Sequence, residues 1–117
     1  MTSDYVNMTH YYANLLADMG EVDRALQSLE KCAAAIKEFH TDLCGDYADI
    51  YFDMGTMHLQ KGNVESAQYC FVEAFRVYNI IYESDREYIT ERFAFLCQFY
   101  EKLKLDVPAD FIAMCLM

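Results

Sequence analysis

The sequence predicts an all-α fold, an α-solenoid in which three helix–turn–helix repeats stack on one another. Three observations favour it. The 117 residues include one proline and four glycines, so long stretches are free to be helical. Apolar residues recur at spacings of three and four, whereas the alternating β-branched runs typical of strands are missing. Small and large residues also recur at a fixed interval of 42 residues.

The apolar periodicity predicts six helices. Their expected ranges are 3–19, 22–39, 46–61, 64–82, 85–103 and 107–116. The middle pair carries the clearest pattern, with Gly55 beside the apolar row of its first helix. The apolar row of helix 46–61 is Tyr51, Met54 and His58. The apolar row of helix 64–82 is Val64, Ala67, Phe71, Ala74 and Tyr78.

Several helix ends have signals of their own. Gly62 suits the left-handed position that ends the third helix, and Asn63 can cap the fourth. Ser84 and Glu87 form a capping-box pattern at the start of the fifth helix. Asp106 stands before the sixth, where the single proline is tolerated in a first turn.

A shift of 42 residues aligns the turns and the packing positions of successive repeats. The first shift pairs Gly20 with Gly62, Val22 with Val64, Ala25 with Ala67, Leu29 with Phe71 and Cys32 with Ala74. The second pairs Tyr51, Met54, Gly55, His58 and Ala67 with Phe93, Leu96, Cys97, Tyr100 and Ala109. The matches concern the size of the side chain more than its identity.

These positions give one row of landmarks per repeat. The middle row is Tyr51, Met54, Gly55, His58, Gly62, Ala67, Phe71 and Ala74. The first row is Thr9, Tyr12, Ala13, Leu16, Gly20, Ala25, Leu29 and Cys32. The third row is Phe93, Leu96, Cys97, Tyr100, Lys104, Ala109, Ala113 and Leu116.

The rows resemble the tetratricopeptide repeat (TPR), whose unit has a large residue, then Leu-Gly, Tyr, Ala, an aromatic and a second Ala at fixed offsets. The interval of 42 is similar to the longer-helix variety found in kinesin light chains. Lys104 departs from the pattern because it replaces the turn glycine. The resemblance implies a right-handed superhelix and one domain over residues 1–117. Its repeats would be approximately 3–42, 45–84 and 87–117.

The resemblance also gives the small residues a role. Gly55, Ala13 and Cys97 would lie where two helix backbones approach closely, and Ala25, Ala67 and Ala109 would do the same on the second helices. A glycine inside a helix costs up to about 1 kcal/mol relative to alanine, which close packing would offset. The alternative is an ordinary helical bundle whose glycines are incidental.

Composition argues against several classes of function. The net charge of −10 disfavours contact with nucleic acid and anionic membranes. No apolar run is long enough to cross a bilayer, and the N-terminus lacks the pattern of a secretion signal. Five cysteines without a CxxC pair or a histidine at ligand spacing predict reduced thiols in a cytoplasmic setting rather than a disulfide or zinc framework, and we expect no metal site and no bound cofactor.

Catalytic signatures are also missing. The histidines, His10, His40 and His58, fall on different elements, and no phosphate loop or paired-carboxylate motif is present. Cys44 beside Gly45 is a candidate reactive thiol, but a plain surface thiol is the simpler interpretation. The sequence therefore predicts a non-enzymatic module that binds a protein or peptide.

The resemblance places the binding groove on the concave side, which the first helix of each repeat lines. The corresponding positions are Asn7, His10, Asn14, Asp18, Asp49, Phe52, Asp53, Thr56, Gln60, Glu91, Ala94, Phe95, Gln98 and Lys102. The acidic residues would attract a basic segment, the phenylalanines would supply apolar contact, and the amides would bond to peptide backbone. The opposing interpretation is that these acids only keep the surface soluble.

One known mode of binding in this family is disfavoured. Some TPR proteins grip a C-terminal carboxylate with a Lys–Asn–Asn–Lys–Arg clamp. The equivalent positions read His10, Asn14, Asp53, Glu91 and Phe95, so only the first asparagine remains. A carboxylate would meet two acids there without a counter-charge.

The second hypothesis is a structural assembly module or a piece of a longer repeat protein. The chain ends in the apolar stretch "DFIAMCLM", whereas such arrays usually end on a polar capping helix. Exposed apolar residues there would pack on a second copy or on further repeats. The residues expected to drive self-association are Phe111, Ile112, Met114 and Leu116, with Met117 beside them.

Overall fold

The computed structural model describes residues 3–38 and 44–116 and contains six helices over these ranges. The helices are α1 (Ser3–Asp18), α2 (Val22–Glu38), α3 (Gly45–Gln60), α4 (Val64–Ile81), α5 (Arg86–Lys102) and α6 (Ala109–Leu116). Each expected helix is present with its ends within two residues, and no strand occurs in the described part of the chain. The all-α prediction is confirmed. His40, the end of the first repeat at 39–42 and Met117 lie outside the described residues.

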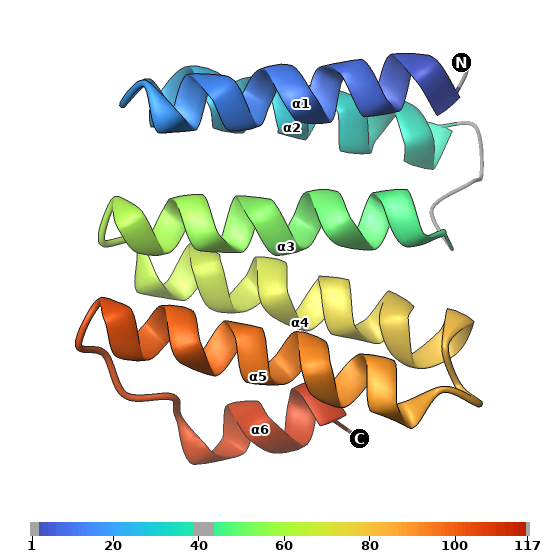
Figure 1. The fold of residues 1–117 in the computed structure, drawn as a ribbon, viewed down its shortest axis with the longest axis vertical. Helices are drawn as coiled ribbons and strands as arrows, with labels where there is room; N and C mark the ends of the chain where they lie inside the picture. Colours follow the sequence, from blue (N-terminus) through green and yellow to red (C-terminus); the bar gives the residue numbers. More distant parts are fainter. Residues whose placement is uncertain (1–2, 39–43, 117) are drawn as a thin grey trace.

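The helices stack as a slab of about 37 × 35 × 20 Å (Figure 1). The pair α1–α2 lies at one end, α3–α4 in the middle and α5–α6 at the other end, with α1, α3 and α5 toward the viewer. Each helix packs against its neighbour in the chain, and α6 packs against both α4 and α5. The first helices of the three pairs therefore share one face of the molecule.

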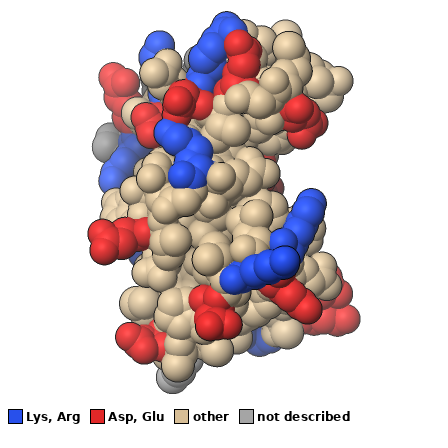
Figure 2. All heavy atoms as spheres, turned by 90° about the vertical axis from the view of Figure 1, so that its left-hand side faces the viewer, with Lys and Arg blue, Asp and Glu red and all other residues tan. Residues whose placement is uncertain are grey.

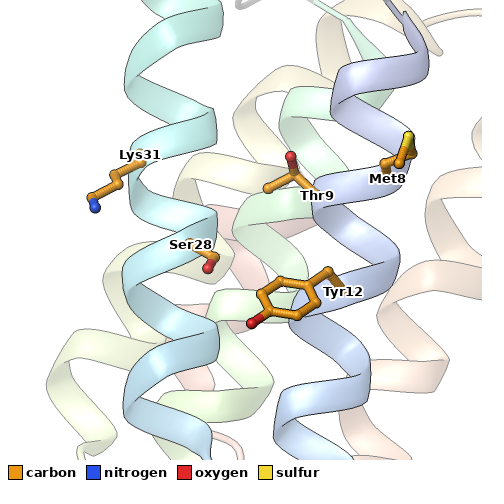
Figure 3. Close-up of a pocket in the computed structure, with 5 residues that line it drawn as sticks. All are labelled: Met8, Thr9, Tyr12, Ser28 and Lys31. Carbon is orange, nitrogen blue, oxygen red and sulfur yellow. The ribbon is translucent and has the colours of Figure 1, made fainter.

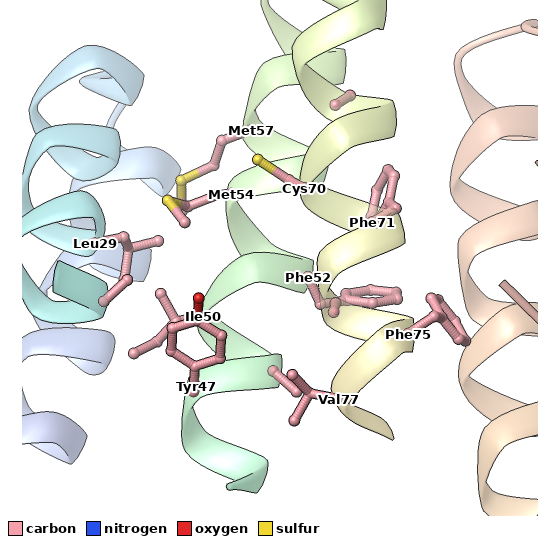
Figure 4. Packing of buried hydrophobic residues seen from close by; sticks show 14 of the residues in the cluster. Leu29, Tyr47, Ile50, Phe52, Met54, Met57, Cys70, Phe71, Phe75 and Val77 are labelled. Carbon is pink, nitrogen blue, oxygen red and sulfur yellow. The ribbon is translucent and has the colours of Figure 1, made fainter. Parts of the chain in front are cut away.

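The middle pair is held at close range by the contact of a glycine with an aromatic ring. A Cβ built on Gly55 of α3 would lie 2.6 Å from Cε1 of Phe71 on α4, closer than real side chains come. Phe71 is fully buried, as are Ala67 and Ala74 on the same helix. Figure 4 shows Phe71 beside Phe52 in the core between these helices. The close approach expected at the glycine is confirmed.

The three turns between paired helices share one geometry. Gly20, Gly62 and Lys104 have φ of 86°, 83° and 60°, and these positions follow one another at intervals of 42 residues. Each turn has two hydrogen bonds of the Schellman type; in the second, the amide of Asn63 donates to the carbonyl of His58 over 2.8 Å. The interval read from the sequence therefore corresponds to a repeated turn.

Lys104 is the one described residue other than glycine with positive φ. A side chain in this left-handed region costs roughly 1–2 kcal/mol, which glycine avoids, although glycine gains backbone entropy in the unfolded chain. We therefore expect Lys104→Gly to raise the free energy of unfolding by up to about 1 kcal/mol. Urea denaturation monitored by circular dichroism measures the change. An equal or lower stability would mean that the turn is not strained.

The second helix of the third repeat departs from the expected register. Ala109 and Ala113 are exposed, whereas Phe111 and Cys115 are buried. The reason is the length of the turn. The helices α2 and α4 begin two residues after their turn glycine, but α6 begins five residues after Lys104. The additional residues rotate α6, so that a different pair of side chains enters the core.

Two expected caps also differ. Asp85 caps α5, and its side chain accepts a hydrogen bond of 3.1 Å from the amide of Tyr88, so the capping box expected from Ser84 does not form. Asn63 occupies the cap position of α4 as expected, but its side chain makes no capping hydrogen bond. In both places the sequence predicted where the helix starts, but it did not predict the side-chain hydrogen bonding at the cap.

Candidate functional site

The face formed by the first helices is hollowed. Figure 2 views the left-hand side of Figure 1, so its right-hand edge is the face that carries α1, α3 and α5, and this edge recedes at mid-height. Most of the expected groove residues on these helices are accessible. Exposed are Asn7, Asn14, Asp18, Gln60, Glu91, Ala94, Phe95, Gln98 and Lys102, and half-buried are His10, Asp49, Asp53 and Thr56.

Phe52 is the exception, because its side chain is fully buried. Its ring packs against Phe71 at 5.2 Å and Phe95 at 5.8 Å between centroids, and the guanidinium of Arg92 lies 4.2 Å above it. The expectation that Phe52 contacts a bound peptide is therefore wrong. Phe95, with half of its surface exposed, is the aromatic ring that a ligand can reach.

Arg92 was not among the expected site residues. It stacks on Phe52 and also lies within 6 Å of the ring centroids of Tyr78 and Phe95. A guanidinium over aromatic faces gains cation–π attraction. The repeat interval aligns Arg92 with Ile50, a buried position, and a basic residue at a core position was the available signal. The concave face thus holds a cation among its acids.

Two of the acidic groove residues have partners within the chain. Asp49 of α3 accepts a hydrogen bond from the hydroxyl of Tyr78 on α4. Burial raises the pKa of Asp49, and the bond from Tyr78 and the charge of Arg92 act against this rise. Asp53, one turn along α3, pairs with the imidazole of His10 on α1. These side chains therefore join neighbouring helices as well as facing the concave side.

The pair of His10 and Asp53 gives stability a specific pH dependence. The hydrogen bond to Asp53 raises the pKa of His10 above its ordinary value of 6.5, and the charges of Asp53, Asp49 and Asp46 add to the rise. The stabilisation is therefore complete below the unfolded-state pKa and is lost as pH increases through the raised folded-state pKa.

We expect His10→Gln to lower the free energy of unfolding by about 0.5–1 kcal/mol near pH 6, with a difference that shrinks as pH increases through the raised pKa of His10. Urea denaturation of both proteins at a series of pH values measures it. His58 is the control, since burial lowers its pKa and His58→Gln should show the opposite slope. A difference for His10→Gln that does not change with pH would mean that the pair contributes no charge interaction.

Cys70 and Cys115 are buried in the core and are not reactive thiols. Burial raises the pKa of Cys70 and of Cys115 to about 12, so both thiols stay protonated near neutral pH. Over residues 3–38 and 44–116, no group of three His, Cys, Asp or Glu side chains is placed to hold a metal ion. Among the helices described, none combines the length and the apolar character that a membrane span requires.

The apolar surface at the two ends of the stack also differs from expectation. Phe111 is fully buried against Phe71 and Tyr100, so it cannot contribute to a self-association surface as expected. Ile112 and Met114 are exposed, and Leu116 is half-buried. The larger exposed apolar surface is on α1, at the opposite end. The sequence did not predict this surface, because a helix in a repeat array is expected to have one apolar face.

A shallow pocket lies beside that surface, between α1 and α2 (Figure 3). It is lined by Met8, Thr9, Tyr12, Ser28 and Lys31. The ring of Tyr12 extends from α1 toward α2, and its hydroxyl accepts a hydrogen bond of 3.4 Å from Arg24.

Stacked helical hairpins with a shared concave face define a helical-repeat protein. A family model, described as the tetratricopeptide repeat, matches residues 4–80, which is more than half of the chain. The chain therefore belongs to the tetratricopeptide repeat family. Domains of this family are in general protein–protein interaction modules rather than enzymes. Searches of curated proteins and of solved structures found no match to the chain.

Proposed function

We propose that the concave face of α1, α3 and α5 binds a segment of another protein that carries basic and apolar residues. The observation that supports this most is the half-exposed ring of Phe95 on a hollowed face that also carries acidic side chains. Phe95 rests on buried Phe52, so the ring is held in place before a ligand arrives. A pre-positioned aromatic side chain loses little conformational entropy on binding.

Charge favours a basic ligand. Asp18 and Glu91 are exposed on the first and third of these helices, and Asp49 and Asp53 lie between them on α3. The internal partners of Asp49 and Asp53 reduce their contribution, so the two exposed acids carry most of the attraction. Exposed pairs of opposite charge chiefly set specificity and the rate of association. The whole chain, with net charge −10, adds to this field.

Exposed amides supply the remaining contacts. Asn7 and Asn14 lie on α1, and Gln98 lies on α5. A primary amide both donates and accepts, so it can bond to either group of a peptide backbone. Such contacts hold an extended or helical segment without reading its sequence. Specificity would then rest on the acids and on Phe95.

A peptide array followed by titration of the best binders tests the proposal. We expect peptides rich in Lys or Arg with apolar residues to bind better than acidic ones, and binding to weaken as salt is raised. Phe95→Ala and Glu91→Lys should each reduce affinity by roughly fivefold or more, because they remove an apolar contact and reverse a charge. Glu65→Lys, at an exposed position of α4, is the matched control and should change affinity little.

Two results would reject the proposal. Acidic peptides that bind as well as basic ones would show that the acids do not select the ligand. Equal losses from Glu91→Lys and Glu65→Lys would show that net charge matters but the concave face does not.

A further inference from the structure

Helix α1 and Met19, the residue directly after it, carry a second apolar face that the described residues leave largely exposed. Met8, Tyr12, Leu15 and Met19 have 72%, 48%, 43% and 72% of their surface exposed, and Tyr11 beside them has 68%. The buried residues of the same helix, Val6, Ala13 and Leu16, face the core instead. We name the exposed set Met8, Tyr11, Tyr12, Leu15 and Met19 the outer stripe of α1.

The outer stripe has the spacing of a helix–helix seam. Met8, Tyr12, Leu15 and Met19 follow at intervals of four, three and four residues, which is the alternation of a heptad repeat. Side chains at this spacing form a narrow line along a helix, and a second helix packs onto such a line at a small crossing angle. The stripe is therefore suited to a helix rather than to an extended peptide.

We propose that the outer stripe pairs with the outer stripe of a second copy of this chain, as two antiparallel α1 helices about a two-fold axis. The spacing reads the same in both directions. An axis midway between Tyr12 and Leu15 places Met8 opposite Met19, and Tyr12 opposite Leu15, in both halves of the contact. A surface that matches itself in this way is what a closed dimer requires.

The charge of the chain favours the same contact. Two copies with a net charge of −10 each repel one another over most approaches. Helix α1 has no Asp, Glu, Lys or Arg from residue 5 to residue 17, so this helix is where two copies meet with least repulsion.

The opposite end of the stack is the weaker candidate for the interface. Helix α6 exposes only Ile112 and Met114 as large apolar residues among those described, because Phe111 and Cys115 are buried. Contact of α6 with α1 of the next copy would also leave free ends and extend without limit. Pairing of the two outer stripes uses the larger apolar surface and closes after two copies.

Such a dimer would leave the concave faces available. The line of Met8, Tyr12, Leu15 and Met19 lies on a different side of α1 from Asn7 and Asn14, and Tyr11 lies between the two sides, next to Asn7. One dimer would then present two binding faces. A partner with two suitable segments would bind with an avidity that a single copy cannot provide.

Sedimentation velocity of the full chain over a range of concentrations tests the proposal. We expect a monomer–dimer equilibrium with no larger species. The variant Met8→Glu/Leu15→Glu should weaken dimerisation at least about tenfold, because it places charges in the seam. The matched control, Ile112→Glu/Met114→Glu, should dimerise as the unmodified chain does. Far-UV circular dichroism checks that each variant retains its helices.

Three outcomes would overturn the proposal. The unmodified chain could be monomeric at every concentration, which would mean that the stripe binds something other than a second copy. Species larger than a dimer would indicate head-to-tail stacking. Loss of the dimer in the α6 variant, with no effect of the α1 variant, would place the interface at the C-terminal helix.

Discussion

Phe71→Ala is expected to lower the free energy of unfolding by about 3–5 kcal/mol, the usual cost of removing a fully buried phenylalanine ring. Phe71 contacts Phe52 within its own repeat and Tyr100 and Phe111 in the next, so its removal leaves a cavity where two repeats meet. Because a domain of this size has a total stability of 5–15 kcal/mol, the loss is a large part of it. Urea denaturation monitored by circular dichroism measures the change.

Phe95→Ala is the matched control for this substitution. It removes the same atoms, but the ring of Phe95 is half exposed and the site opens to water. We expect a loss of about 1 kcal/mol or less, since solvent fills the space. Similar losses for the two variants would mean that Phe71 is not a central residue of the core.

Gly55→Ala is expected to lower the free energy of unfolding by about 1–3 kcal/mol, the typical cost of adding atoms to a packed core. The new Cβ would lie 2.6 Å from Phe71, whose ring is enclosed and cannot move aside freely. This result would reverse the ordinary preference, since alanine favours a helix over glycine by about 1 kcal/mol. Thermal and urea denaturation of the two proteins measure the difference.

Ala34→Gly provides the reference for helix preference alone. Ala34 is exposed in the interior of α2, so its replacement changes helix propensity without changing packing. We expect a loss of about 1 kcal/mol. If Gly55→Ala instead stabilised the protein by that amount, Gly55 would be an incidental glycine, as in an ordinary helical bundle.

Features set by short stretches of chain were predicted well from the sequence. The limits of the helices follow from apolar spacing and from Gly20 and Gly62, which adopt the left-handed conformation that glycine accepts at no steric cost. Gly55 and Ala67 were assigned to close helix contacts because they occupy the small-residue positions of the repeat that the sequence resembles. Both are buried in the structure. Local geometry and the size of side chains were sufficient here.

Features that depend on how an element is rotated were not predicted. The turn before α6 is three residues longer than the other two turns, and this length buries Phe111 and exposes Ala109. An alignment at a fixed interval of 42 residues cannot account for the additional residues. Phe52 was assigned to the groove from its position on α3, but its ring turns under Phe95 and Arg92. The pairing of His10 with Asp53 joins residues 43 positions apart, so no local pattern indicates it. Such contacts depend on the packed arrangement of all three repeats.

The outer stripe of α1 was missed for a different reason. Its residues are visible in the sequence, and Met8, Tyr12, Leu15 and Met19 have a regular spacing. A helix in a repeat array is expected to have one apolar face, and the inward row with Ala13 had already been assigned. A helix with two apolar faces and no Asp, Glu, Lys or Arg between residues 5 and 17 indicates a second packing surface.

A double-mutant cycle with Gly55→Ala and Phe71→Leu tests whether contact between these two side chains fixes the spacing of α3 and α4, on which the concave face depends. Leucine lacks the outer ring atoms of Phe71 that lie closest to the added methyl group. We expect the cost of Gly55→Ala to fall by at least about 1 kcal/mol when residue 71 is leucine, which is a coupling typical of residues in contact. An unchanged cost in both backgrounds would show that the glycine does not accommodate this ring, and the proposed basis of the helix spacing would be wrong.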